Sequence, residues 1–144
     1  MSEGNISRKV RLVVYFRARE HCEYCMCPST HSSSNFCMEH IIPVAKGGKD
    51  VLENLALSCH GCNGHKHVRV SFKDPASGEF APLFNPRTQF WKEHFKWNEN
   101  YTKIIGQTPE GRATVAALKM NRKKLVKLRS VFNDCGLHPP AHSV

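Results

Sequence analysis

The sequence lacks the apolar segments that membrane-spanning and secreted proteins carry. No apolar run approaches the roughly 20 residues that a bilayer-spanning helix needs. The N-terminal segment MSEGNISRKV also lacks the apolar stretch of a secretory signal. These features disfavour a membrane protein, and we expect a soluble, cytoplasmic protein with no membrane partner.

Acidic residues are scarce. The 144 residues include 12 Asp and Glu against 21 Lys and Arg, which gives a net charge of +9. A surplus of this size on a single domain, here residues 1–144, favours a polyanionic partner, because each cation that neutralises a phosphate releases counterions. Charge alone leaves nucleic acid and other acidic ligands open.

The seven cysteines are an odd number, which argues against a closed disulfide framework. Four of them form two CxxC pairs, namely Cys22, Cys25, Cys59 and Cys62. A two-residue spacer lets two thiolates face one ion, and two such pairs supply the tetrahedral sulfur shell that zinc favours. A redox CxxC is the alternative, but two pairs without a thioredoxin-like βαβ pattern disfavour it. The sequence therefore predicts one structural Zn²⁺.

Local patterns predict an α+β fold around this zinc site. A helix is expected from Ser7, as N-cap, to about residue 20. A strand is expected at residues 36–42, then a glycine turn, a strand or helical turn at 51–57, and a short helix at 63–70. Residues 8–70 would thus form a core of strand, turn, strand and helix.

Residues 71–136 are expected to form a mainly helical extension. An aromatic cluster there favours packing against the core, although base stacking is an alternative; its members are Phe84, Phe90, Trp91, Phe95, Trp97 and Tyr101. Thr108 and Pro109 are typical of a helix start, and Gly136 is placed to end that helix. Residues 137–144 are expected to be a poorly ordered tail.

The predicted C-terminal helix is rich in cations and has no acidic residue between Arg112 and Arg129. A charge run is often only a solvated face, but a run of one sign favours contact with a phosphate backbone. The candidate contacts are Arg112, Lys119, Arg122, Lys123 and Lys127.

A second constellation supplies the groups that phosphodiester hydrolysis needs. His40 can deprotonate water near neutral pH, and Glu39 offers an oxygen ligand of the kind that Mg²⁺ prefers. Asn54 and Asn63 could orient the imidazole or complete the site. Because neighbouring strand residues point to opposite faces, Glu39 and His40 can share one site only if the strand end is bent.

These pieces resemble the HNH nucleases, whose active site is the ββα-metal (His-Me) finger. The resemblance covers about residues 8–70 and rests on four short motifs in the right order. They are the two cysteine pairs, the EHIIP and GG segments at 39–43 and 47–48, Asn54-Leu55, and CN..K at Cys62, Asn63 and Lys66.

The resemblance implies a role for each matching position. His40 would be the general base, and Asn54 would orient His40 or brace its loop. Glu39 and Asn63 would hold one catalytic Mg²⁺ or Mn²⁺, with His67 as a candidate third ligand. Family members mostly cleave DNA and leave a 5′-phosphate, so double-stranded DNA is the expected partner. The helix near Asn63 would then bring Lys66 and Arg69 close to phosphates.

The resulting prediction is a metal-dependent DNA endonuclease with a small zinc-bound ββα-metal core, an N-terminal helix and a helical extension. Two alternatives stay open: a zinc-containing DNA-binding module without catalysis, and a nuclease of this kind that acts on RNA. The sequence does not fix the oligomeric state, and a homodimer is one option.

Overall fold

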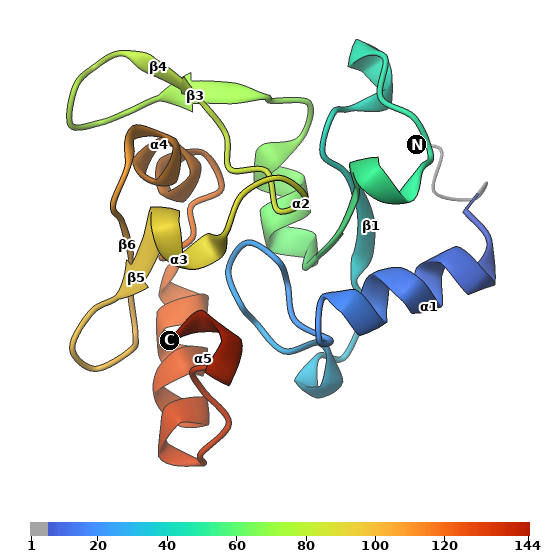
Figure 1. The fold of residues 1–144 in the computed structure, drawn as a ribbon. Coiled ribbons are helices and arrows are strands. Elements are labelled where there is room, and N and C mark those ends of the chain that lie inside the picture. Colours follow the sequence, from blue (N-terminus) through green and yellow to red (C-terminus); the bar gives the residue numbers. More distant parts are fainter. Residues whose placement is uncertain (1–5) are drawn as a thin grey trace.

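The computed structural model describes residues 6–144, which form short helices and three two-stranded antiparallel sheets (Figure 1). The helices are α1 (Arg8–Arg17), α2 (His60–Lys66), α3 (Trp91–His94), α4 (Pro109–Ala117) and α5 (Lys123–Asp134). The strands are β1 (Cys37–His40), β2 (Leu55–Ser58), β3 (Ser71–Lys73), β4 (Phe80–Pro82), β5 (Phe95–Trp97) and β6 (Ile104–Gly106). Short 3₁₀ turns occupy Ser29–His31, Val44–Lys46, Leu52–Asn54 and Ala141–Ser143. This mixture confirms the α+β class.

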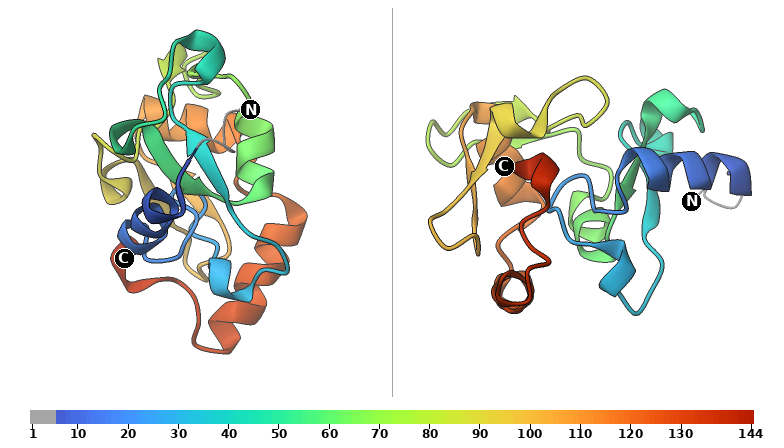
Figure 2. Two further views of the ribbon diagram at one scale, coloured as in Figure 1. Left: turned by 90° about the vertical axis from the view of Figure 1, so that its right-hand side faces the viewer. Right: turned by 60° about the horizontal axis from the view of Figure 1, so that its bottom comes forward.

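Helix α2 lies between two groups of elements (Figures 1 and 2). On one side it packs beside β1, and α1 packs beside β2. On the other side lie the hairpins β3–β4 and β5–β6, both in contact with α4. None of the described helices is long and apolar enough to cross a membrane.

The N-terminal core follows the sequence pattern closely. Ser7 caps α1, since its Oγ accepts a hydrogen bond from the Val10 amide at 3.2 Å. Strand β1 pairs with β2 so that His40 lies opposite Leu55. Helix α2 begins at residue 60 rather than 63, because the Cys59 sulfur caps it by accepting from the Cys62 amide.

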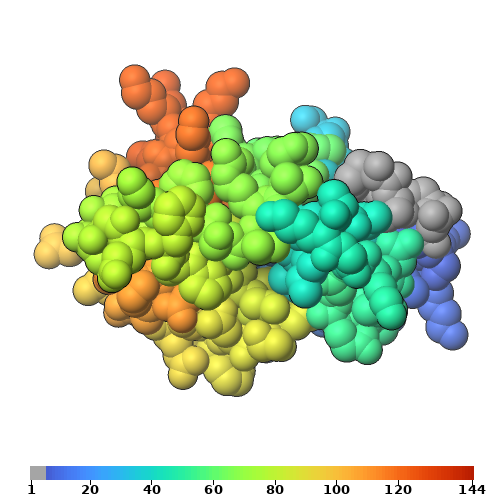
Figure 3. All heavy atoms as spheres, turned by 90° about the horizontal axis from the view of Figure 1, so that it is seen from above, coloured from blue at the N-terminus to red at the C-terminus, as the bar shows by residue number. Residues whose placement is uncertain are grey.

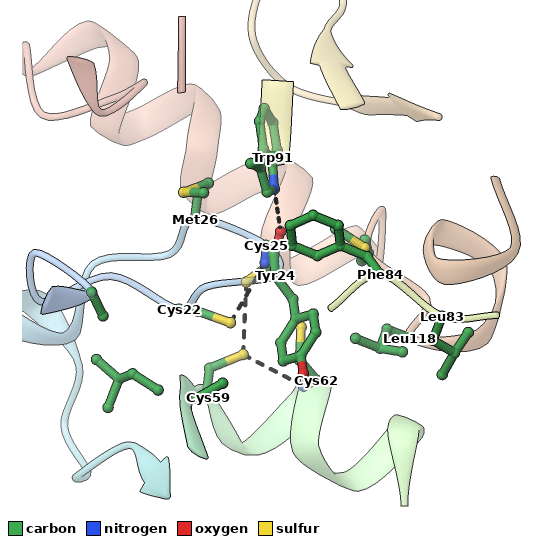
Figure 4. Packing of buried hydrophobic residues seen from close by; sticks show 14 of the residues in the cluster. Cys22, Tyr24, Cys25, Met26, Cys59, Cys62, Leu83, Phe84, Trp91 and Leu118 are labelled. Atoms are coloured by element: carbon green, nitrogen blue, oxygen red, sulfur yellow. Dashed lines mark hydrogen bonds between the residues drawn. The ribbon is translucent and has the colours of Figure 1, made fainter. Parts of the chain in front are cut away.

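The aromatic cluster packs inward, as predicted, at most of its positions. Phe84, Trp91, Phe95 and Trp97 are buried, whereas Phe90 and Tyr101 are exposed. The Trp91 indole donates to the backbone carbonyl of Tyr24 at 2.8 Å (Figure 4). The extension is therefore joined to the cysteine-bearing loop by a buried hydrogen bond.

The single helix expected from Pro109 to Gly136 is wrong, because two helices, α4 and α5, stand in its place. The chain turns between them at Lys119, whose φ is 49°. The Asn121 amide holds the backbone N–H and C=O of Ile104 in β6, at 2.8 and 2.9 Å. This pairing with a strand edge fixes the turn, and helical periodicity carries no sign of it.

The prediction of a poorly ordered tail at residues 137–144 is also wrong. His138 and Ser143 are buried, and the Ser143 hydroxyl accepts from the Trp97 indole at 3.0 Å. The His138 ring meets the Trp97 ring edge to face, with centroids 4.6 Å apart. Tertiary contacts with β5 order this segment, although its own sequence has no helical or strand pattern.

A buried ion pair fastens the β3–β4 hairpin to α4. Both Asp74 oxygens accept from the Arg112 guanidinium at 2.9 Å, and Asp74 has no exposed surface. The bonds from Arg112 lower the pKa of the Asp74 carboxyl, with the Ala76 amide and the Ser77 hydroxyl adding to the effect. Arg112, assigned to the nucleic-acid surface above, thus has an internal partner.

The lowered pKa predicts how acid affects this contact. A carboxyl with a lowered pKa in the folded state stabilises the fold above its unfolded pKa of about 3.9, and loses that contribution as the pH falls through the folded value. Asp74→Asn should therefore lower the melting temperature at neutral pH, and its difference from wild type should shrink in strong acid. Thermal denaturation of both proteins across pH measures this, and a constant difference would contradict it.

Candidate active site and metal centre

Four cysteines bring their sulfurs together where the loop after α1 meets the start of α2 (Figure 4). The Sγ atoms of Cys22, Cys25, Cys59 and Cys62 all lie within 4.8 Å of one another, and all four side chains are buried. Thiolates that surround Zn²⁺ tetrahedrally at about 2.3 Å stand about 3.8 Å apart. The Sγ atoms of Cys25 and Cys59 are 3.7 Å apart. The cluster fits a zinc ion, as the sequence predicts.

Arg122 reaches this cluster from the turn before α5. Its guanidinium nitrogens lie 3.9 Å from the sulfurs of Cys59 and Cys62, and it also donates to the Leu118 carbonyl at 2.8 Å. A Cβ at Gly61 would come within 2.6 Å of this guanidinium, so glycine leaves room for it. The predicted phosphate contact of Arg122 competes with these internal contacts, which place its charge beside the thiolates.

Glu39 and His40 are neighbours at the end of β1, where they pair with Ala56 and Leu55 in regular register. Glu39 and His40 both line one cavity of about 410 Å³. The Lys66 ammonium holds the strand end, because it donates to the carbonyls of His40 and Ile41 at 3.3 and 2.9 Å. The chain leaves β1 only after His40, so the bend does not itself turn the two neighbouring side chains to one face; what the two residues share is the cavity that both line.

Glu39 is buried and is hydrogen-bonded at both oxygens. Oε1 accepts from the Tyr24 hydroxyl at 2.5 Å, and Oε2 accepts from the Lys66 ammonium at 3.0 Å. Burial raises the pKa of Glu39, while Lys66 and then Tyr24 act to lower it. Each carboxylate oxygen has a second lone pair, so Glu39 can still ligate a cation beside these partners.

The prediction that Lys66 contacts phosphates is wrong. The sequence places it near phosphates, but its side chain is buried, with 1% of the residue exposed. Its hydrogen bonds to Glu39, His40 and Ile41 use the three donors of an ammonium group. Lys66 therefore acts as an internal support for the strand end, and surface charge counts cannot reveal such burial.

His40 contacts the carboxylate of Asp50, a residue that the sequence did not single out. Its Nε2 lies 2.6 Å from Oδ1 of Asp50. The His40 side chain is 5% exposed and that of Asp50 is 32% exposed. The His40 imidazole is thus buried, whereas the Asp50 carboxylate beside it is partly exposed to solvent.

Asn54 braces the loop after β1, which is one of the two roles expected for it. Its amide oxygen accepts from the Ile42 amide at 2.8 Å, and its nitrogen donates to the carbonyls of Ile42 and Lys49 at 3.0 and 3.1 Å. Gly48 lies against the same strand end. A Cβ there would stand 1.7 Å from the Ile42 carbonyl oxygen, so only glycine permits this close approach.

Gly48→Ala should therefore destabilise the protein, because the loop must move to admit the methyl group. Overpacking of this kind costs about 1–3 kcal/mol. Gly64→Ala is the matched control: a Cβ at Gly64 in α2 would meet nothing within 4 Å, and alanine favours a helix. Denaturant unfolding of the zinc-loaded proteins measures both changes. Equal stability of the two variants would contradict the packing described.

The remaining predicted ligands lie on the other wall of the cavity. Asn63 in α2 and His67 at its end line the cavity together with Glu39 and His40. His67 ends the helix, with a φ of 51° and an amide that donates to the Asn63 carbonyl at 2.9 Å. Glu39, Asn63 and His67 carry a carboxylate, an amide and an imidazole, which are groups that can ligate a divalent cation, and all three residues line this cavity.

Comparison with known proteins agrees with this geometry. Residues 22–69, about a third of the chain, match the sequence profile of the HNH endonuclease family. The chain carries an HNH domain. The matched segment holds all four clustered cysteines and every residue that lines the cavity between Glu39 and Val68. The family consists of nucleases, so a nuclease-type function is supported in general.

One curated relative extends beyond the HNH domain. It is the "Septu protein PtuB" of Bacillus thuringiensis, which is 28% identical over an aligned length of 120 residues. The alignment covers 78% of this chain. The alignment covers 41% of the relative's length, so the chain spans about two fifths of that protein. Because the HNH match covers only residues 22–69, the likeness to PtuB includes part of the extension. No solved structure gives a significant match.

The other predicted cations lie at the surface around the HNH helix. Lys119, Lys123 and Lys127 are exposed, and so is Arg69, whose guanidinium lies 5.6 Å from the Phe72 ring centre. In Figure 3 side chains near residue 120 project beside the segment that contains α2. Burial lowers the pKa of His65 on α2, and the positive charges of Arg122, Lys119 and Arg69 lower that pKa further. The extension thus adds positive charge next to α2.

Two residues of this site were missed by the sequence reading. Tyr24 stands between the paired cysteines and reaches Glu39, so it joins the cysteine loop to the cavity. Asp50 reaches His40 from the end of the glycine turn. The only signal for either was position, within CEYC for Tyr24 and directly after GGK for Asp50.

Proposed function

We propose that this protein is a metal-dependent endonuclease that hydrolyses phosphodiester bonds of DNA. The observation that carries the proposal is the cavity that Glu39, His40, Asn63 and His67 share within the matched HNH segment. These four side chains supply a base and a ligand set for a divalent cation, as phosphodiester hydrolysis requires.

His40 would accept a proton from water, and the oxygen that it activates would attack phosphorus while the 3′-oxygen leaves. Glu39 and Asn63 would hold a Mg²⁺ or Mn²⁺ ion, with His67 as a third ligand. When bound, this ion neutralises charge on the phosphate and on the departing oxygen. Lys66 and Asn54 would hold the backbone at residues 40–42 in place through their hydrogen bonds, and with it the position of His40.

The basic surface suits a nucleic acid, and we propose duplex DNA as the substrate. Four exposed cations lie after α2 and after α4, namely Arg69, Lys119, Lys123 and Lys127. They can neutralise phosphates, and binding should weaken steeply with salt. The likeness to PtuB continues beyond the HNH segment, so the two proteins share part of the extension as well.

A DNA-binding module without catalysis is the second candidate. One observation favours it: the Lys66 ammonium already neutralises the Glu39 carboxylate at 3.0 Å. A divalent cation would have to bind next to that charge. An HNH nuclease that acts on RNA is a third option, because the exposed cations would neutralise the phosphates of RNA as well as those of DNA.

Cleavage of matched substrates separates these candidates. Zinc-loaded protein is incubated with duplex DNA, single-stranded DNA and RNA of one sequence, with Mg²⁺, with Mn²⁺ or with no added divalent ion. We expect cutting of the duplex only with an added ion, with 5′-phosphate ends. Salt-sensitive binding without cutting of any substrate would favour the binding module, and cutting of RNA alone would favour the third option.

A further inference from the structure

The His40 imidazole is held at one nitrogen by Asp50, and this contact assigns different tasks to the two ring nitrogens. Nε2 of His40 lies 2.6 Å from Oδ1 of Asp50. An ionised carboxylate only accepts hydrogen bonds, so Nε2 must carry a proton in this contact. We propose that Asp50 is a positioning residue that keeps His40 protonated at Nε2, so that Nδ1 is the atom that takes the proton from water.

This inference rests on the proposed function for its last step only. The orientation of the ring and its tautomer are properties of the folded protein, and they can be measured without a substrate. An imidazole that is 5% exposed cannot rely on bulk water to fix its tautomer. A carboxylate at hydrogen-bonding distance does so, as it does for histidines that ligate metals or act as bases.

The loop that carries Asp50 is built to hold it there. Gly47 has a φ of +90°, which favours glycine, and Gly48 lies so close to Ile42 that no side chain fits. Asn54 then binds the Lys49 carbonyl at 3.1 Å, directly before Asp50. Both ends of the turn are therefore attached to the strand end that carries His40, and Asp50 has little freedom to move away.

The charge of Asp50 also suits the step that His40 would perform. When the ring accepts a proton at Nδ1 it becomes a cation, and a carboxylate 2.6 Å from Nε2 stabilises that cation. The proton that leaves water then resides on Nδ1, and the one on Nε2 stays shared with Asp50. Asp50 touches neither substrate nor metal in this scheme and acts only through His40.

The first test is the tautomer of His40, read by ¹⁵N NMR of the imidazole in zinc-loaded protein without Mg²⁺. His40→Ala identifies the signals. The wild type should show the Nε2–H tautomer, and Asp50→Ala should lose this preference. Asp50→Asn keeps an acceptor oxygen and should retain it in part. A wild-type ring protonated at Nδ1, or an unchanged tautomer in Asp50→Ala, would overturn the proposal.

The second test is kinetic. Asp50→Ala should lower kcat by about 10- to 100-fold, the usual loss when a partner that orients a functional histidine is removed. Its affinity for DNA should stay at the wild-type value. Glu53→Gln is the control, because Glu53 is exposed in the same loop and the change removes the same charge. An equal loss of kcat in Glu53→Gln would overturn the assignment to Asp50.

The two tests fail separately. If no substrate is cleaved but the tautomer depends on Asp50, then the proposed function is wrong while the positioning of His40 by Asp50 stands. If DNA is cleaved and the tautomer is independent of Asp50, then the function stands and this inference is wrong. Circular dichroism of Asp50→Ala and Asp50→Asn shows whether each variant is folded before either test is read.

Discussion

Replacing His40 with alanine is expected to lower the rate of DNA cleavage by about 10²- to 10⁴-fold, the range that a general base contributes. His40 lines the cavity with both candidate metal ligands of the HNH domain, and 6% of the residue is exposed. The change deletes the group that takes the proton from water. It leaves the cysteine cluster and the braces on the backbone in place.

Folding and DNA binding of His40→Ala should therefore stay close to wild type. Asp50 loses its contact with His40, but 32% of its side chain is exposed and water can replace that contact. His31→Ala is a matched control, since His31 is exposed in a 3₁₀ turn outside the cavity. Initial rates on a labelled duplex, with binding isotherms, measure the effect. Loss of binding together with cleavage would contradict a catalytic role for His40.

Replacing Cys59 with serine is expected to abolish the zinc site and to unfold the HNH core. Structural zinc binding is coupled to folding and contributes about 10–16 kcal/mol in small zinc domains, as much as or more than the whole stability of a typical domain, about 5–15 kcal/mol. Cys59 is 9% exposed, caps α2 and lies 3.7 Å from the Cys25 sulfur. Its loss would remove a ligand and the start of the helix together.

Cys135→Ser is the matched control for this change. Cys135 follows α5, is exposed and lies outside the cysteine cluster. The zinc content of the purified proteins and their circular dichroism spectra test the prediction. Wild type and Cys135→Ser should each hold one zinc ion and melt cooperatively. A folded Cys59→Ser protein with a full zinc content would contradict the assignment of this cluster as the structural zinc site.

The sequence was sufficient where chemistry depends on close spacing along the chain. Two CxxC pairs predict a tetrathiolate cluster because a two-residue spacer fixes the direction of both sulfurs. Glu39 and Asn63 are 24 residues apart, and their placement at one site came from the resemblance to the HNH nucleases rather than from spacing. Ser7 and Thr108 mark the starts of α1 and α4 because capping is a local interaction.

The sequence was insufficient where partners come from distant segments. Lys66 looks like a surface cation, and only the burial of Glu39 against it shows that it is an internal one. The break between α4 and α5 depends on Asn121 binding Ile104, which is 17 residues earlier in the chain. Arg112 looks like part of a basic run, and the acid that neutralises it, Asp74, is 38 residues away.

The most direct test of the proposed hydrolytic site is cleavage of supercoiled plasmid by zinc-loaded wild type and His40→Ala side by side. Each is assayed with Mg²⁺, with Mn²⁺ and with no added ion. We expect the wild type to nick or linearise the plasmid only with an added ion, and His40→Ala to leave it supercoiled. Equal cleavage by both proteins, or no cleavage by a folded wild type that binds DNA, would contradict the account.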